Sequence, residues 1–199
     1  MENYYHELPE GYKAIKSIDA KDKKTIIWFN LVAIIMMVIA ALPFLVLKPV
    51  DMSNRDMYIP FVLIVSIGMI AYIILHELTH GLIYKIYTKQ KLTFGLTLFV
   101  AFCGVPNIYV SKKVSLVSVL APFVLYSVIL IPTLILMSAN YLYLAFIIIF
   151  AVHFGGCVGD LYVTNVLLKL KGKILMNDTG PKQTFYQLDE NTIVSEFPE

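Results

Sequence analysis

The most specific chemical pattern in the sequence is His76-Glu77-Leu78-Thr79-His80. On a helix, residues four apart lie on one face, about 6 Å apart along the axis, so the two imidazoles can share one metal ion. Metalloproteases hold zinc in this way and use the intervening glutamate as general base. Glu77 would take a proton from metal-bound water and pass it to a leaving amine. The alternative is a helix with two structural histidines, which lipid disfavours because it offers no water to satisfy them.

A zinc site of this kind needs a third protein ligand and one open position. Asp160 is the best candidate, because it and the histidines are predicted to lie at the same depth. Tyr58 and Tyr141 mark the outer ends of two apolar runs. His76 follows Tyr58 by 18 residues, about 27 Å of helix, and Asp160 follows Tyr141 by 19 residues, about 29 Å. Both distances place the groups nearer the cytoplasmic face. The alternative for Asp160 is an aspartate that snorkels at a helix end.

His153 precedes Asp160 by seven residues, so a continuous helix would present both on one face. His153 would lie about 10 Å deeper in the membrane. It could bind the substrate carbonyl or the developing oxyanion, or it could be a structural histidine, with a third-ligand role as a lesser alternative. Cys157, on the same face, is interpreted as a packing residue, with a thiolate ligand as the alternative. Gly155 and Gly159 form a GxxxG pattern on the opposite side, which predicts close packing against a neighbouring helix.

The elements that must position these residues are membrane spans. Of the 199 residues, 58% are hydrophobic and 15% are charged, whereas a soluble domain typically has about 45–50% and about 25%. This composition excludes a disordered chain and a disulfide scaffold and disfavours a soluble enzyme, and no basic block points to nucleic acid. Uncharged apolar runs predict an all-α polytopic membrane protein with four transmembrane helices. They cover residues 26–47, 58–87, 114–137 and 141–166.

Polar segments flank these spans. We divide the chain into a cytoplasmic N-terminal segment (1–25), a transmembrane metalloprotease-like domain (26–166) and a cytoplasmic C-terminal tail (167–199). Residues 92–110 are apolar but interrupted by glycine and proline, and they are rich in Thr, Phe and Val. This composition predicts a short β-hairpin or re-entrant segment after the HExxH helix. A strand edge beside the metal could hold an extended peptide by main-chain hydrogen bonds.

The positions of Lys and Arg predict the orientation of the spans. With four spans, 14 of the 16 basic residues fall on one side of the membrane and 2 on the other. Both termini are therefore predicted to be cytoplasmic. Fifteen of the basic residues are lysine, which hints at an AT-rich bacterial genome and so at a bacterial cell membrane.

Taken together, the motifs resemble a bacterial domain-of-unknown-function family of membrane zincin peptidases, related in plan to the site-2 proteases. The likeness rests on Leu8-Pro9-Glu10-Gly11-Tyr12, on His76 through Gly81, on Leu120-Ala121-Pro122 and on His153 through Asp160. Site-2 proteases carry an aspartate in a later span as third zinc ligand, which implies that role for Asp160. They also carry an asparagine shortly before it that assists the substrate carbonyl, and His153 stands in the comparable place. Their Asp-Gly is Asp160-Leu161 here.

These observations predict a zinc-dependent intramembrane endopeptidase. His76, His80 and Asp160 would hold Zn²⁺, Glu77 would act as general base and acid, and His153 would assist the substrate carbonyl. The partners would be the lipid bilayer and a membrane-anchored protein or peptide cleaved near the cytoplasmic leaflet, and not nucleic acid; the sequence sets no oligomeric state. One alternative is a membrane metal-ion transporter or sensor, although no inverted repeat is visible. Another is a catalytically inactive zincin-like protein that only binds partners.

Overall fold

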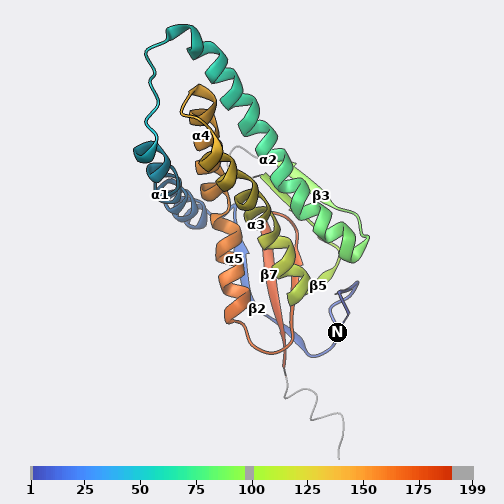
Figure 1. The fold of residues 1–199 in the computed structure, drawn as a ribbon. Helices are drawn as coiled ribbons and strands as arrows, with labels where there is room; N and C mark the ends of the chain where they lie inside the picture. The colour runs from blue at the N-terminus through green and yellow to red at the C-terminus, as the bar shows by residue number, and fades with distance from the viewer. Residues whose placement is uncertain (1, 97–100, 190–199) are drawn as a thin grey trace, which may run out of the picture.

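The computed structural model describes residues 2–96 and 101–189 of the chain (Figure 1). Within these residues, four helices are long and apolar enough to cross a membrane. They are α1 (Lys23–Leu47), α2 (Tyr58–Thr88), which follows the short 3-10 turn η1 (Arg55–Met57), α3 (Lys112–Leu136), and a fourth made of α4 (Tyr141–Gly156) and α5 (Val158–Lys169). The four predicted spans thus correspond to helices, and the fourth is interrupted at Cys157.

Three of the helices begin at a capping side chain. Asp22, Ser111 and Asn140 each accept a hydrogen bond from the backbone N–H three residues further on, at 3.0, 3.5 and 2.9 Å, ahead of α1, α3 and α4. Such caps satisfy N–H groups that have no partner within the helix. The polar residues just before each apolar run therefore fix where these helices start.

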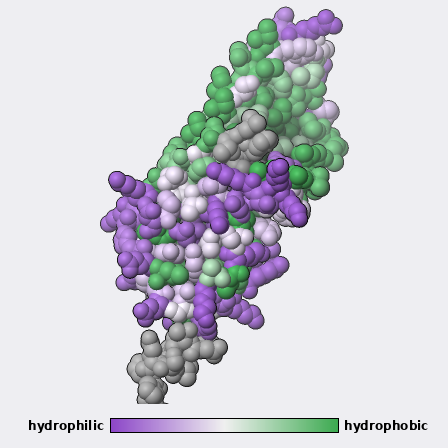
Figure 2. Space-filling model, turned by 180° about the vertical axis from the view of Figure 1, so that it is seen from behind, coloured by the Kyte–Doolittle hydropathy of each residue, from purple (hydrophilic) through white to green (hydrophobic). Residues whose placement is uncertain are grey.

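The surface divides into an apolar part and a polar part. Figure 2 shows hydrophobic side chains covering the helical end of the molecule and hydrophilic side chains covering the other end. Large apolar side chains on the outside of α1 and α2 are exposed, among them Ile34, Val38, Val62 and Ile70. In water these side chains would be unfavourable, whereas a bilayer would solvate them.

The predicted all-α fold class was wrong in one respect, because the polar end is a five-stranded antiparallel sheet. Its order is β1-β5-β6-β7-β2, and its strands are β1 (Tyr4–Tyr5), β2 (Tyr12–Asp19), β5 (Tyr109–Ser111), β6 (Ile174–Asp178) and β7 (Lys182–Leu188). The long strand β2 pairs with β7, so that Tyr12 lies opposite Leu188. The N-terminal segment and the C-terminal tail thus form one sheet. Strand pairing between such distant segments leaves little signal in either segment alone.

The hairpin expected after the HExxH helix is present. Strand β3 (Thr93–Leu96) pairs antiparallel with β4 (Ala101–Gly104), and residues 97–100 between them lie outside the described residues. The hairpin packs on α2 at Gly81, where an added Cβ would lie 3.2 Å from the Cys103 sulfur. At its other end, a Cβ on Gly104 would lie 2.3 Å from the Gly180 nitrogen, in the β6–β7 turn. The hairpin is therefore held between the HExxH helix and the five-stranded sheet.

Helix α1 packs along α4, and the GxxxG pattern lies in this contact. A Cβ on Gly155 would lie 2.5 Å from Met37 Cε and 3.1 Å from the Ala33 carbonyl oxygen, and one on Gly159 would lie 3.9 Å from the Phe29 ring. The predicted close packing is thus confirmed, and α1 is the neighbour. A separate hydrophobic core joins the sheet to α2, α3 and α5; its fully buried members include Tyr84, Ile108, Leu167, Met176 and Phe185.

Candidate metal centre

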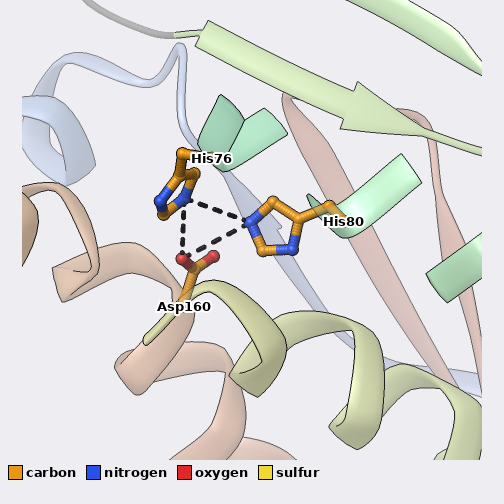
Figure 3. Close-up of side chains that lie close together, drawn as sticks. All are labelled: His76, His80 and Asp160. Carbon is orange, nitrogen blue, oxygen red and sulfur yellow. Dashed lines mark hydrogen bonds and ion pairs between the residues drawn. The ribbon is translucent and has the colours of Figure 1, made fainter. Parts of the chain in front are cut away.

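Two elements bring three potential ligands together. Helix α2 presents His76 and His80, one turn apart, and α5 presents Asp160 from the opposite side (Figure 3). The two Nε2 atoms are 3.2 Å apart, and Asp160 Oδ2 lies 3.2 Å from His76 Nε2 and 3.5 Å from His80 Nε2. The three residues predicted as metal ligands thus form one group that could hold a metal ion.

The dimensions of this group fit zinc. Ligand atoms about 2.0–2.1 Å from a tetrahedral zinc ion are separated from one another by about 3.3–3.4 Å. The three separations of 3.2, 3.2 and 3.5 Å match that spacing. Among the described residues, Asp160 Oδ2 is buried and has no hydrogen-bond donor. A buried carboxylate oxygen in this state is costly unless a cation neutralises it.

The outer nitrogens of the two imidazoles have their own partners. His80 Nδ1 lies 2.9 Å from the Ser118 carbonyl oxygen, which can only accept a hydrogen bond. His80 Nδ1 therefore carries the proton, and the Nε2 atom of the neutral ring presents a lone pair. His76 Nδ1 lies 2.9 Å from the Tyr72 hydroxyl. Partners of this kind orient the histidine ligands in metal sites.

Glu77 lies beside the three ligands in the wall of a cavity of about 420 Å³. The cavity is bounded by α1, α2, α5, β4 and the β6–β7 turn, so it lies where the helices meet the sheet. The Glu77 side chain is half-buried, and the backbone N–H of Cys103 in β4 donates to its carboxylate. A carboxylate in this position can exchange protons with a molecule in the cavity.

His153 lies behind His76, away from the ligand triangle. It is completely buried, its Nδ1 is 3.0 Å from the Tyr72 hydroxyl, and its Nε2 is 3.0 Å from the Ser127 hydroxyl. The described residues that line the cavity do not include it. The interruption at Cys157 separates it from Asp160, so the two do not share the face that a continuous helix would give them. The Cys157 sulfur lies 3.6 Å from His153 Nδ1, outside the ligand group.

A second buried carboxyl group links the sheet to the HExxH helix. The Tyr84 hydroxyl, one turn beyond His80, donates to Asp178 Oδ2 at 2.7 Å, and the Gly180 N–H donates to Oδ1 at 2.8 Å. The Asp178 carbonyl oxygen accepts from the Val105 N–H, just after β4, at 2.8 Å. Burial raises the pKa of the Asp178 carboxyl group to about 6, despite these donors. Asp178 thus connects α2, β4 and the β6–β7 turn around the cavity.

Sequence reasoning missed Tyr72, Ser118, Ser127 and Asp178. Tyr72 had a weak signal, since it lies four residues before His76 in an apolar run and so on the same helix face. The two serines lie on α3, and nothing in their local sequence connects them with the histidines. Asp178 lies in a polar tail that was expected to be solvated.

A sequence model of the family described as "Putative zincin peptidase" matches residues 69–175, more than half of the chain. The chain belongs to this family. The matched stretch of this zincin-family chain contains both histidines of the HExxH motif, Glu77 and Asp160, whereas α1, β1, β2 and β7 lie outside it. The family description indicates a zinc-dependent peptidase. Comparisons with curated proteins and with solved structures found no match.

Proposed function

We propose that the protein is a zinc-dependent intramembrane endopeptidase that cleaves a membrane-anchored protein or peptide near the cytoplasmic leaflet. The observation that carries the proposal is the buried triangle of two imidazole nitrogens and one carboxylate oxygen, with Glu77 beside it in the cavity wall. Three protein ligands and an open fourth position are typical of catalytic zinc sites. A structural zinc site would have four protein ligands.

In this mechanism, His76, His80 and Asp160 hold the metal ion. When bound, zinc polarises the scissile carbonyl group and makes water acidic enough to lose a proton near neutral pH. Glu77 accepts the proton from the attacking water and then donates it to the nitrogen of the leaving amine. Tyr72 and His153 act behind His76 and do not touch the substrate.

The walls of the cavity support a peptide substrate that comes from a membrane. On one side, α1 contributes the apolar side chains Phe29, Ala33 and Met37, and on the other side β4 contributes Ala101 through Cys103. Among the described strands, β4 pairs only with β3. Its second edge is available to add an extended substrate strand through main-chain hydrogen bonds. A peptide must be extended before cleavage, because a helix buries its carbonyl groups in internal hydrogen bonds.

The location is proposed on the same grounds. Four apolar helices and the apolar surface of Figure 2 support insertion in a bilayer. The basic residues fall mainly on the side of the sheet, which supports a cytoplasmic sheet and cytoplasmic termini. The metal centre, where the helices meet the sheet, would then lie towards the cytoplasmic face of the membrane.

The test begins with the metal content of purified, detergent-solubilised protein. We expect about one zinc ion per wild-type chain, loss of zinc in Asp160→Ala, and retention of zinc in Glu77→Gln. Cleavage is then followed on a panel of single-span reporter proteins co-reconstituted in liposomes. Cleavage by wild type that is abolished in zinc-loaded Glu77→Gln would support the mechanism. Absence of zinc from wild type after reconstitution would refute the proposal. Zinc flux into protein-containing liposomes, lost in His80→Ala but unchanged in Glu77→Gln, would establish a transporter instead.

A further inference from the structure

A buried chain of polar side chains runs from the metal ligand His76 away from the cavity. The Tyr72 hydroxyl lies 2.9 Å from His76 Nδ1 and 3.0 Å from His153 Nδ1. His153 Nε2 lies 3.0 Å from the Ser127 hydroxyl on α3. The exposed fraction is 6% for Tyr72, 7% for His76 and 0% for His153. These groups must therefore satisfy one another's hydrogen bonds within the protein.

The single proton of the Tyr72 hydroxyl allows two arrangements of this chain. In one, His76 Nδ1–H donates to Tyr72, and Tyr72 donates to His153 Nδ1. His76 Nε2 then presents a lone pair towards Asp160. In the other, Tyr72 donates to His76 Nδ1 and accepts from His153 Nδ1–H. The neutral His76 ring then carries its proton on Nε2, where it blocks the metal position. Only the first arrangement leaves His76 able to bind a metal.

The surroundings of His153 select between these arrangements. The backbone carbonyl of Phe123, one turn before Ser127 on α3, accepts a hydrogen bond from the His153 ring. A carbonyl oxygen can only accept, so it favours a proton on the ring nitrogen that faces α3, which is Nε2. With the proton on Nε2, the Nδ1 atom of the neutral ring is an acceptor, and Tyr72 must donate to it. The Phe123 ring also stacks on His153, with centroids 5.8 Å apart, and helps to exclude water.

We propose that Tyr72 and His153 are positioning residues that hold His76 in the tautomer that binds the metal. This inference rests on the proposed metal site and adds a role for two residues outside it. His153, through Tyr72, fixes the proton of His76 on Nδ1 before any metal arrives. The site is then preorganised, and metal binding needs no transfer of that proton.

The first test compares zinc affinity in Tyr72→Phe and Tyr126→Phe by competition with a chromogenic chelator. Tyr126 is a matched control, because its ring lies 5.5 Å from that of Tyr72 and its hydroxyl also contacts α2, at Thr79 Oγ1, 3.0 Å away. We expect Tyr72→Phe to weaken zinc binding by about 10- to 100-fold, as loss of a ligand's hydrogen-bond partner typically does. We expect Tyr126→Phe to change affinity by less than about twofold, because its hydroxyl contacts no ligand. Equal affinities of Tyr72→Phe and wild type would overturn the proposal.

A second pair of variants tests the role of His153. His153→Leu removes the acceptor for Tyr72 and should weaken zinc binding about as much as Tyr72→Phe. His153→Asn places a side-chain carbonyl oxygen in that position and should recover most of the affinity. A purely structural role would not distinguish the two in this way. Equal losses in His153→Asn and His153→Leu would contradict the inference.

The tautomers can also be read directly by ¹⁵N NMR of metal-free protein labelled at its four histidines. We expect the proton of His76 on Nδ1 and that of His153 on Nε2, and a mixture at His76 in Tyr72→Phe. A wild-type His76 protonated mainly on Nε2 would refute the assignment. This measurement needs no metal, so failure of the proposed function, seen as absence of zinc binding in wild type, is distinguishable from failure of this inference.

Discussion

Replacement of Asp178 by Asn should remove a pH-dependent loss of stability that the wild-type protein carries. Burial raises the pKa of the folded carboxyl group to about 6, from 3.8 in an unperturbed aspartate. As the pH rises between these values, the unfolded chain releases the proton while the folded protein retains it. The folded state is therefore favoured by this group at low pH, and the advantage is lost as the pH rises through about 6.

The size of the effect follows from the two pKa values. The gap between 3.8 and about 6 is worth about 3 kcal/mol, of which about 2 kcal/mol falls between pH 4.5 and pH 7.5. Asn is uncharged throughout, and its side-chain oxygen can accept from the Gly180 N–H while its amide donates to a rotated Tyr84 hydroxyl. In a protein of this size, 1 kcal/mol moves the melting temperature by about 2–4 °C. The melting temperature of Asp178→Asn should therefore gain about 4–8 °C on wild type between the two pH values.

The assay is thermal unfolding of detergent-solubilised protein followed by circular dichroism at several pH values, with a chelator present. The metal ligands are the same in both proteins, so their protonation cancels in the difference between the two melting temperatures. Tyr84→Phe should act in the opposite direction, because it removes a donor that stabilises the ionised carboxylate, at a cost of about 1.5–3 kcal/mol near neutral pH. A difference between wild type and Asp178→Asn that does not change with pH would refute the reasoning.

Three further substitutions test packing and capping contacts. Gly180→Ala should lower the free energy of unfolding by at least about 1 kcal/mol, because Gly180 has a φ of +95° and its Cβ would lie 2.2 Å from Phe102 Cδ2; Phe102→Ala in the same chain should recover the steric part in thermal melts. Gly155→Val should cost about 1–3 kcal/mol by forcing α1 away from α4 at Met37, which disulfide trapping across that contact would detect. Lys48→Met should cost about 1–2 kcal/mol and speed hydrogen exchange at the end of α3, because the Lys48 ammonium group donates to two carbonyl oxygens there, at 2.7 and 3.0 Å.

The sequence by itself determined the helices and the identity of the ligand group. Long apolar runs predict spans because each residue's preference for lipid adds along the chain. The spacing of His76 and His80 fixes their common face through the helical repeat alone. Asp160 could be placed near them because two spans that cross the same bilayer share one scale of depth. These inferences need only local geometry and one common reference plane.

Only the tertiary structure decided what surrounds that group. The pairing of β2 with β7 joins the two ends of the chain, and no local pattern in either segment specifies its partner. The interruption at Cys157 moves His153 off the face of Asp160 and behind His76, where Tyr72 reaches it. Asp178 becomes a buried carboxyl group only because the sheet carries it against Tyr84. Such partners are set by burial, which requires each buried polar group to find a hydrogen bond wherever the folded chain supplies one.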